Sequence, residues 1–116
     1  MTMPDCIFCR IARKEIPAKA VFEDDLVLAF EDIKPQAPVH IVVIPKEHIE
    51  KLSDIDRERA GIMGRLTAAA NKIAADKGIA STGYRVVVNC GKNAGQAVAH
   101  LHLHLLGVRA LGWPPG

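Results

Sequence analysis

The stretch AVAHLHLHLLG, residues 97–107, alternates histidine with leucine and constrains the fold more than any other part of the chain. A β-strand sends successive side chains to opposite faces. One strand would therefore carry two unlike faces, with His100, His102 and His104 on one and Leu101, Leu103 and Leu105 on the other. Leucines pack well in a core, whereas imidazoles bind metals, move protons and attack electrophiles near neutral pH. We expect chemistry on the histidine face, against the alternative of a solvated row of histidines.

The spacing of the three histidines indicates that they do not all serve one centre. Residues two apart on a strand are separated by about 6.5–7 Å, so neighbouring imidazoles can converge on one atom. The first and third are about 13 Å apart and cannot easily share a metal ion. We therefore expect the three to divide their labour.

The rest of the chain predicts an α+β domain with a five-stranded antiparallel sheet. Apolar spacing predicts a short N-terminal helix over residues 6–14 and a long helix over 54–77, the latter opened by a Ser53–Asp56 capping box and stopped at Gly78. Strands are expected at residues 20–23, 26–30, 39–45 and 84–89, followed by the histidine stretch as the fifth. Short turns between strands favour antiparallel pairing, and the long helix would cover one face.

Size and composition narrow the class of protein. The 116 residues fit one domain, residues 1–116. A net charge of +2 gives no argument for nucleic acid or a membrane surface as a partner. No stretch approaches the roughly 20 apolar residues of a spanning helix, and the N-terminus lacks an apolar run of signal-peptide length. We expect a cytoplasmic protein.

Two of the three cysteines are spaced as in half of a zinc site. Cys6 and Cys9 form a C-x-x-C pair, although buried cysteines also occur as small apolar residues without any metal. His48, just after the third predicted strand, and His100 are available as a third and a fourth ligand. Cys90 has no evident partner and is interpreted as structural.

Two polar features lie beside the predicted strands. Residues 89–96, NCGKNAGQ, are glycine-containing and directly precede the histidine stretch. Glycines let backbone N–H groups turn toward an anion, so this loop is a candidate phosphate site as well as a plain hairpin turn. It is not a P-loop, because no Gly-Lys-Ser/Thr follows. Asp32, after the strand LVLAF, either solvates a turn or accepts hydrogen bonds from a sugar diol.

The whole chain resembles the histidine triad superfamily and, within it, the branch of histidine triad nucleotide-binding proteins. The matching segments run in order from near residue 6 to the end: EIPAK at 15–19, FEDD at 22–25, LAFEDI at 28–33, PQAPVHIVVIPKEHI at 35–49, YRVVVN at 84–89, GQ at 95–96, HLHLHLLG at 100–107 and WPPG at 113–116. Many separate motifs agree, so the resemblance is specific.

The resemblance implies an α+β homodimer whose sheet continues across two subunits. It implies binding of purine nucleotides and hydrolysis of purine nucleoside phosphoramidates through a nucleotidyl-histidine, with release of AMP or GMP. His102 would be the nucleophile, supported by the other three members of the implied catalytic set: His40, His100 and His104. The implied nucleotide contacts are Asn89, Gly95, Gln96 and Ala97 at the phosphate, Asp32 at the ribose, and Ile7, Phe8, Ile11, Phe30 and Ile33 at the base, with Trp113 reaching the site across the dimer.

The chain departs from the branch at two positions and agrees with some of its members at a third site. Position 97 is alanine where much of the branch has a hydroxyl residue, and position 99 is alanine where an aromatic is usual. The set Cys6, Cys9, His48 and His100 looks like the zinc site of some bacterial members. The resemblance thus implies a structural zinc, with no metal required for catalysis.

Other functions stay open at this point. Dinucleoside polyphosphate hydrolases and nucleotidyl transferases use the same triad, although WPPG at 113–116 favours the phosphoramidase branch. A nucleotide-binding or scaffold protein with incidental catalysis is a further alternative. So is a metalloenzyme that uses the triad as ligands.

Overall fold

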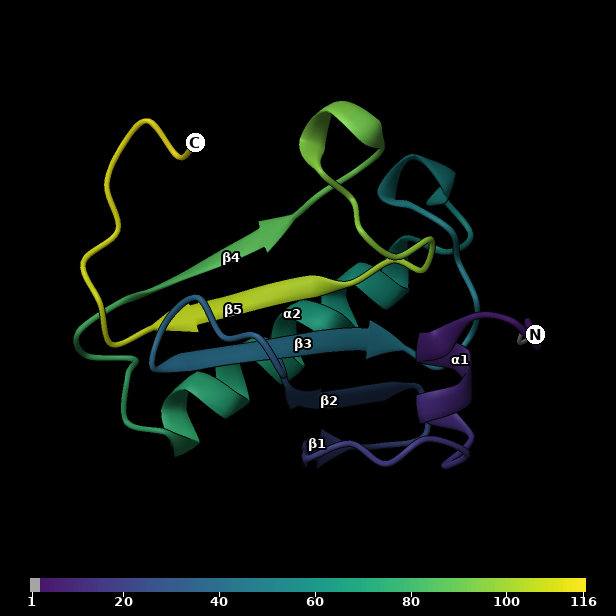
Figure 1. The fold of residues 1–116 in the computed structure, drawn as a ribbon, viewed down its shortest axis with the longest axis horizontal. Coiled ribbons are helices and arrows are strands. Elements are labelled where there is room, and N and C mark those ends of the chain that lie inside the picture. The colour runs from purple at the N-terminus through teal and green to yellow at the C-terminus, as the bar shows by residue number, and fades with distance from the viewer. Residues whose placement is uncertain (1–2) are drawn as a thin grey trace.

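The computed structural model describes residues 3–116, which contain one five-stranded antiparallel sheet and two α-helices (Figure 1). The strands are β1 (Ala20–Glu23), β2 (Val27–Glu31), β3 (Val39–Pro45), β4 (Tyr84–Val88) and β5 (Leu103–Gly107), in the order β1-β2-β3-β5-β4. The helices are α1 (Ile7–Ala12) and α2 (Ala60–Asp76), with short 3-10 turns at η1 (Leu52–Asp54) and η2 (Lys92–Ala94). This architecture confirms the predicted α+β fold. Among these residues, no helix combines the length and apolar character needed to cross a membrane.

Helix α2 covers one face of the sheet and closes the larger core. Every second residue of the central strands faces it, and the core includes Val27, Ala29, Ile41, Val43, Leu66, Ala70, Ile73, Leu103 and Leu105. Leu101, just before β5, is buried in the same core. The predicted leucine face of the histidine stretch therefore packs under α2, where burial of each leucine contributes about 1.5–3 kcal/mol.

The opposite face carries a smaller apolar cluster and the short helix α1. Leu28 and Phe30 of β2 and Val42 and Ile44 of β3 alternate with the residues that face α2, and they pack with Phe8 and Ile11 of α1. In Figure 1, α1 lies at one end of β3, away from α2. His40 shares this face with Val42 and Ile44, as the strand period predicts.

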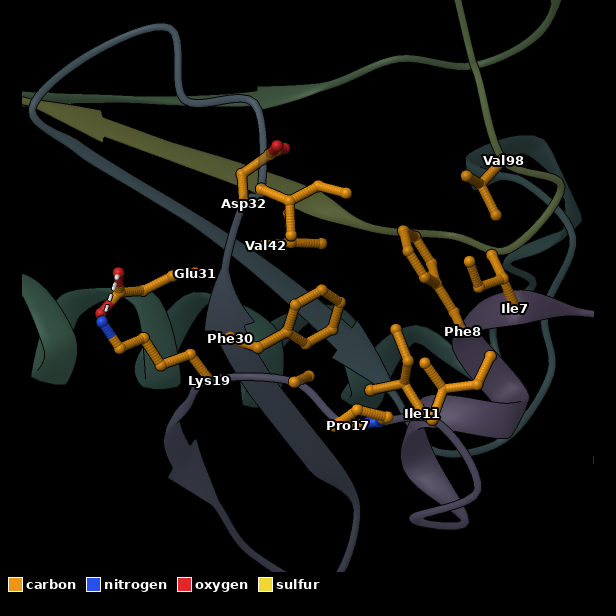
Figure 2. A pocket seen from close by; sticks show the side chains of 13 residues that line it. Ile7, Phe8, Ile11, Pro17, Lys19, Phe30, Glu31, Asp32, Val42 and Val98 are labelled. Atoms are coloured by element: carbon orange, nitrogen blue, oxygen red, sulfur yellow. Dashed lines mark ion pairs between the residues drawn. The ribbon is translucent and has the colours of Figure 1, made fainter.

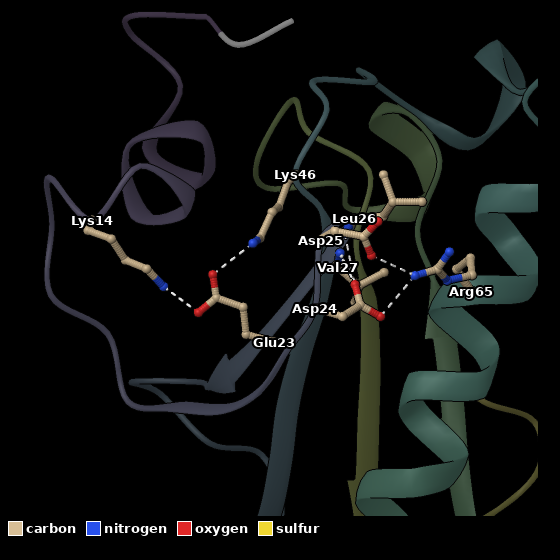
Figure 3. Close-up of polar contacts among 8 residues, drawn as sticks. All are labelled: Lys14, Glu23, Asp24, Asp25, Leu26, Val27, Lys46 and Arg65. Atoms are coloured by element: carbon tan, nitrogen blue, oxygen red, sulfur yellow. Dashed lines mark hydrogen bonds and ion pairs between the residues drawn. The ribbon is translucent and has the colours of Figure 1, made fainter.

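The β1–β2 turn is held by its own aspartates, as shown in Figure 3. Asp24 Oδ1 accepts hydrogen bonds from the backbone N–H groups of Leu26 (2.9 Å) and Val27 (2.8 Å). Arg65 of α2 contacts both Asp24 (3.1 Å) and Asp25 (3.0 Å). The predicted turn at these aspartates is confirmed, and it also joins the hairpin to α2.

The prediction for the start of the long helix was wrong. Helix α2 begins at Ala60, with Arg59 as its N-cap residue, and the Ser53–Asp56 box does not open it. Residues 52–54 instead form η1, and Asp56 Oδ1 accepts a hydrogen bond from the Arg59 backbone N–H at 3.0 Å. Leu52 and Ile55 pack against the core from this separate turn, and their spacing in the sequence resembles that of a helix. Apart from the start of β5, the other element ends differ from prediction by no more than two residues.

The histidine stretch is also less regular than predicted. Strand β5 begins at Leu103, so His100 and His102 precede it. The neighbouring strand explains this, because the β3–β5 register puts Leu101 opposite Pro45, the last residue of β3, which has no N–H to donate. Instead, the Leu101 N–H donates to the Ile49 carbonyl at 2.7 Å. The alternation of buried leucines persists through this segment without the full ladder.

Candidate functional site

The five histidines form two groups at the two ends of the histidine stretch. His48 and His100 lie together, with ring centroids 5.0 Å apart. His40 and His104 lie together at 5.1 Å, and the His102 ring is 4.9 Å from that of His104. The three histidines of the row are therefore divided between two groups in the fold.

The first group is joined by the two cysteines of the C-x-x-C pair. Cys6 Sγ lies 3.3 Å from His100 Nδ1, and Cys9 Sγ lies 3.3 Å from His48 Nδ1 and 3.6 Å from His100 Nδ1. The four ligand atoms all lie within 4.8 Å of one another. We call Cys6, Cys9, His48 and His100 the thiol–imidazole cluster.

The thiol–imidazole cluster fits a zinc ion. A tetrahedral site with Zn–S of about 2.3 Å and Zn–N of about 2.0 Å separates sulfur from nitrogen by roughly 3.5 Å, close to the sulfur–nitrogen distances here. His100 Nε2 donates to the Pro45 carbonyl at 2.8 Å, which leaves the Nδ1 lone pair facing the thiols. Burial lowers the pKa of His100 to about 4, so this imidazole is neutral at pH 7. Burial also raises the pKa of the Cys9 thiol when no cation is bound.

His102 is held in one tautomer by the backbone. Its Nδ1 lies 2.7 Å from the His100 carbonyl oxygen, which can only accept, so Nδ1 carries the proton. The lone pair is then on Nε2, the arrangement that a nucleophilic imidazole needs. The Phe8 ring packs edge-on against the His102 ring, with centroids 5.1 Å apart.

The second group forms a directed chain of hydrogen bonds. The Gln36 backbone N–H donates to His40 Nδ1 at 3.0 Å, so the proton of neutral His40 is on Nε2. His40 Nε2 then donates to His104 Nδ1 at 2.8 Å, which leaves His104 with an Nε2–H donor. Asp32 Oδ2 lies 3.4 Å from His40 Nε2. Burial lowers the pKa of His104 to about 4, and it lowers the pKa of His40 despite the Asp32 carboxylate.

An apolar cavity of about 580 Å³ is shown in Figure 2, and two of its lining residues, Phe8 and Asp32, contact His102 and His40 respectively. All the residues that the resemblance implied for a base pocket line it: Ile7, Phe8, Ile11, Phe30 and Ile33. Asp32 also lines it, and the Asp32 carboxylate is the one that lies near His40 Nε2. Phe8 connects the cavity to His102, because its ring lines the cavity and packs against the imidazole.

Other predicted contacts do not line this cavity. The Gln96 amide is already hydrogen-bonded to backbone groups: Oε1 accepts from the Gly91 N–H, and Nε2 donates to the Glu50 and Val98 carbonyls. Ala97 is exposed and lines a second opening beside Cys6 and His48. Three further positions are also outside it: Asn89 is half-buried, Gly95 is exposed, and the Trp113 side chain is 83% exposed in the single chain.

Several residues of the cavity were not predicted from the sequence. Val42, Val98, Ile16 and Pro17 line it as well. Val42 carried a usable signal, because it alternates with His40 on the same face of β3. Val98 follows the same period, two residues before His100. No comparable pattern marks Ile16 and Pro17, which reach the cavity from the connection between α1 and β1.

Comparison with known sequences identifies a family and similar proteins. Residues 13–111 match the HIT domain family. An uncharacterised HIT-like protein of Synechococcus elongatus is 54% identical over 112 residues, which cover 97% of each chain. The purine nucleoside phosphoramidase of Escherichia coli is 48% identical over 108 residues, which cover 93% of this chain and 91% of that enzyme.

Solved structures agree with the sequence matches. A HIT family hydrolase from Legionella pneumophila superposes with a TM-score of 0.95 at 47% identity, covering 97% of this chain and 100% of that one. A histidine triad protein from Clostridium difficile superposes with a TM-score of 0.94 at 49% identity, covering 97% of each chain. Fold and sequence therefore point to the same group of proteins.

Proposed function

The chain belongs to the HIT family, and from this premise we propose that it hydrolyses purine nucleoside phosphoramidates and releases the nucleoside 5′-monophosphate. The observation that carries the proposal is the hydrogen bond from His102 Nδ1 to the His100 carbonyl, beside an apolar cavity. In the neutral imidazole, this bond leaves the lone pair on Nε2. The 48% identity to an E. coli purine nucleoside phosphoramidase supports the choice of reaction.

In the proposed reaction, His102 Nε2 attacks the α-phosphorus. The P–N bond breaks as the bond from Nε2 to phosphorus forms, the leaving nitrogen takes a proton from solvent, and a nucleotidyl-histidine remains. Water then attacks phosphorus and releases the monophosphate and the free imidazole. The His104 Nε2–H, set by the chain from Gln36 through His40, is a donor for a phosphoryl oxygen as negative charge develops there.

The proposed nucleotide pose follows the lining of the cavity. The purine enters between Phe8, Ile11 and Phe30, where apolar contact gives affinity. The ribose hydroxyls donate to Asp32, which already accepts from the Lys34 N–H at 2.8 Å and has lone pairs to spare. The phosphate lies near His102, with Asn89 and the backbone after Gly95 as further proposed donors.

The thiol–imidazole cluster is proposed to hold zinc apart from the reacting atoms. Four protein ligands close a tetrahedral site, so bound zinc would supply folding stability there. The proposed chemistry at phosphorus needs only the imidazoles and backbone donors.

We also propose a homodimer in which the sheet continues through β4. This strand is at the edge of the sheet, and its outward residues Tyr84 and Val86 are 36% and 43% exposed. An unpaired strand edge is a template for a second strand. Trp113, which is largely exposed in one chain, would then gain a partner surface. Light scattering that gives a monomer would contradict this arrangement.

The test of the activity is a substrate panel. The purified protein is assayed with adenosine and guanosine phosphoramidates and with diadenosine polyphosphates, and zinc is measured on the same sample. We expect turnover of the phosphoramidates with AMP or GMP as product. Preferred cleavage of the polyphosphates would assign the chain to that hydrolase class. Nucleotide binding without any turnover would leave a binding protein, and loss of activity in step with metal removal at the triad would favour a metalloenzyme.

A further inference from the structure

Helix α1 takes part in two sites at once. It carries Cys9 and is capped by Cys6, so it supplies both thiols of the thiol–imidazole cluster. It also supplies Ile7, Phe8 and Ile11 to the wall of the cavity (Figure 2). A displacement of this helix would therefore alter both sites together.

Little else ties α1 to the sheet. A helix of six residues is too short to be stable alone. Within residues 3–116, its backbone hydrogen bonds stay inside residues 3–15. The nearby Lys14–Glu23 pair in Figure 3 is solvent-exposed, and such pairs contribute little. The remaining attachments are the contacts of Cys6 and Cys9 with the imidazoles and the apolar packing of Phe8 and Ile11.

His100 links the thiol–imidazole cluster to the proposed nucleophile. Its Nδ1 faces the thiols, its Nε2 donates to the Pro45 carbonyl, and its own carbonyl accepts from His102 Nδ1. A ligand that fixes the His100 ring therefore also fixes the peptide group that orients His102. Phe8 makes a second link, because its ring contacts both His100 and His102.

We propose that a metal ion bound by Cys6, Cys9, His48 and His100 positions α1 and His102 for the nucleotide, so that metal binding and nucleotide binding favour each other. The four ligands are positioning residues, and none of them touches the substrate through its side chain. This inference rests on the proposed function, since it requires the nucleotide to occupy the cavity beside Phe8. By linkage, the factor by which zinc raises AMP affinity equals the factor by which AMP raises zinc affinity.

The test measures the zinc dissociation constant by competition with a chromophoric chelator, with and without saturating AMP. We expect AMP to lower this constant about tenfold, within the 5- to 150-fold range usual for coupled sites. Ribose 5-phosphate at the same concentration controls for zinc binding to the phosphate itself. An unchanged constant would mean that the metal only stabilises the fold, and it would overturn the proposal.

Two matched variants trace the coupling to α1. Phe8→Leu and Phe30→Leu each remove an aromatic ring from the same cavity, but Phe8 is on α1 and Phe30 is on β2. Both should weaken AMP binding. Phe8→Leu should reduce the coupling to less than about threefold, whereas Phe30→Leu should retain the wild-type factor. Equal coupling factors in both variants would overturn the proposal. Zinc that acts only by stabilising the whole fold would give this result.

The two proposals fail in distinguishable ways. If AMP does not bind the zinc-loaded protein, the proposed function is wrong and the coupling falls with it. If phosphoramidates are hydrolysed and AMP binds, but zinc affinity is unchanged, only the coupling is wrong.

Discussion

His100 and His104 are four residues apart in the same stretch, yet their surroundings differ completely. His100 is fully buried, and its ring is fixed between two thiols and the Pro45 carbonyl. His104 is half-buried, pairs with His40, and lies near the Asp32 carboxylate beside the cavity. Burial lowers the pKa of both to about 4, so burial alone does not separate their roles.

The difference between the two ends lies in their partners. Thiols and a carbonyl surround His100 with a closed set of groups that suits a metal ion. His104 has one nitrogen bonded to another imidazole and an Nε2–H free to meet a ligand. His102, between them, is oriented by the first end and adjoins the second. Each prediction below tests whether the two ends serve separate purposes.

The largest expected effect is at the middle histidine. His102→Asn should lower the rate of phosphoramidate hydrolysis by about 10⁴-fold or more, the scale on which loss of a nucleophile acts. AMP binding, measured by calorimetry, should be nearly unchanged because the cavity is intact. His104→Asn is the comparison, and its rate should fall less because it removes a donor rather than the nucleophile. A near-normal rate for His102→Asn would show that the nucleophile is elsewhere.

At the closed end, Cys6→Ser should remove zinc and lower the thermal midpoint. Zinc at 100 times its dissociation constant stabilises by about 2.7 kcal/mol, which corresponds to roughly 10 °C for a chain of this size. Metal analysis and a thermal scan measure the two effects. Cys90→Ser is the matched control, because Cys90 lies outside the cluster and contacts Ser53 instead. Protein that is purified without chelator and contains no zinc would refute the metal assignment.

A substitution at position 97 tests whether this position serves the phosphate or the thiol–imidazole cluster. The resemblance puts this residue at the phosphate, but Ala97 lines the opening beside Cys6 and His48. If the hydroxyl of Ala97→Ser reaches the leaving group, a hydrogen bond of about 1.5 kcal/mol in the transition state would raise kcat about tenfold. Steady-state kinetics on one phosphoramidate decide the matter. An equal or lower kcat would assign position 97 to the surroundings of the thiol–imidazole cluster.

The smallest expected effect is a pH dependence of the stability that arises from His104. The pKa of His104 is about 4 in the folded chain against an ordinary value of 6.5. Below pH 6.5 the unfolded chain therefore binds a proton that the folded chain does not, so stability falls as pH drops from 6.5 toward 4. The pKa of His40 is also lowered, so His40 changes the stability in the same direction. His102 lowers the pKa of His104 further, whereas the Asp32 carboxylate raises it.

Denaturation at pH 7, 5.5 and 4.5 measures this dependence. The slope from His104 should be less than the maximum of about 1.4 kcal/mol per pH unit, because the side chain is partly exposed. His104→Gln cannot titrate, so its stability should decline less steeply over this range. Parallel slopes for the two proteins would mean that other groups cause the decline.

The sequence predicted the parts of the fold in which neighbouring residues contrast sharply. Alternating faces identified the central strands, and Asp24–Asp25 identified the hairpin turn. The start of α2 was mispredicted because Leu52 and Ile55 pack on the core from a 3-10 turn, which local spacing cannot distinguish from a helix. The shortened β5 depends on where its partner β3 ends, and a strand's own sequence does not contain that information.

The site was predictable to the extent that its residues follow a period or a motif. The C-x-x-C pair suggested half of the thiol–imidazole cluster, and the fold brings His48 and His100 to it. The carbonyl partners of His100 and His102 were beyond prediction, because backbone atoms of every residue look alike in a sequence. Ile16 and Pro17 reach the cavity through the path of a loop, which no periodicity encodes.

The two-faced alternation from Leu101 to Leu105 also limits how this chain can evolve. Insertion or deletion of one residue between His100 and β5 would exchange the faces, placing imidazoles under α2 and leucines against the cavity. Point substitutions change one side chain at a time. A single-residue change in length would displace the leucines from the core and the imidazoles from the site together. Length variation among functional descendants of this chain should therefore be confined to the loops, with the distance between His100 and Gly107 held constant.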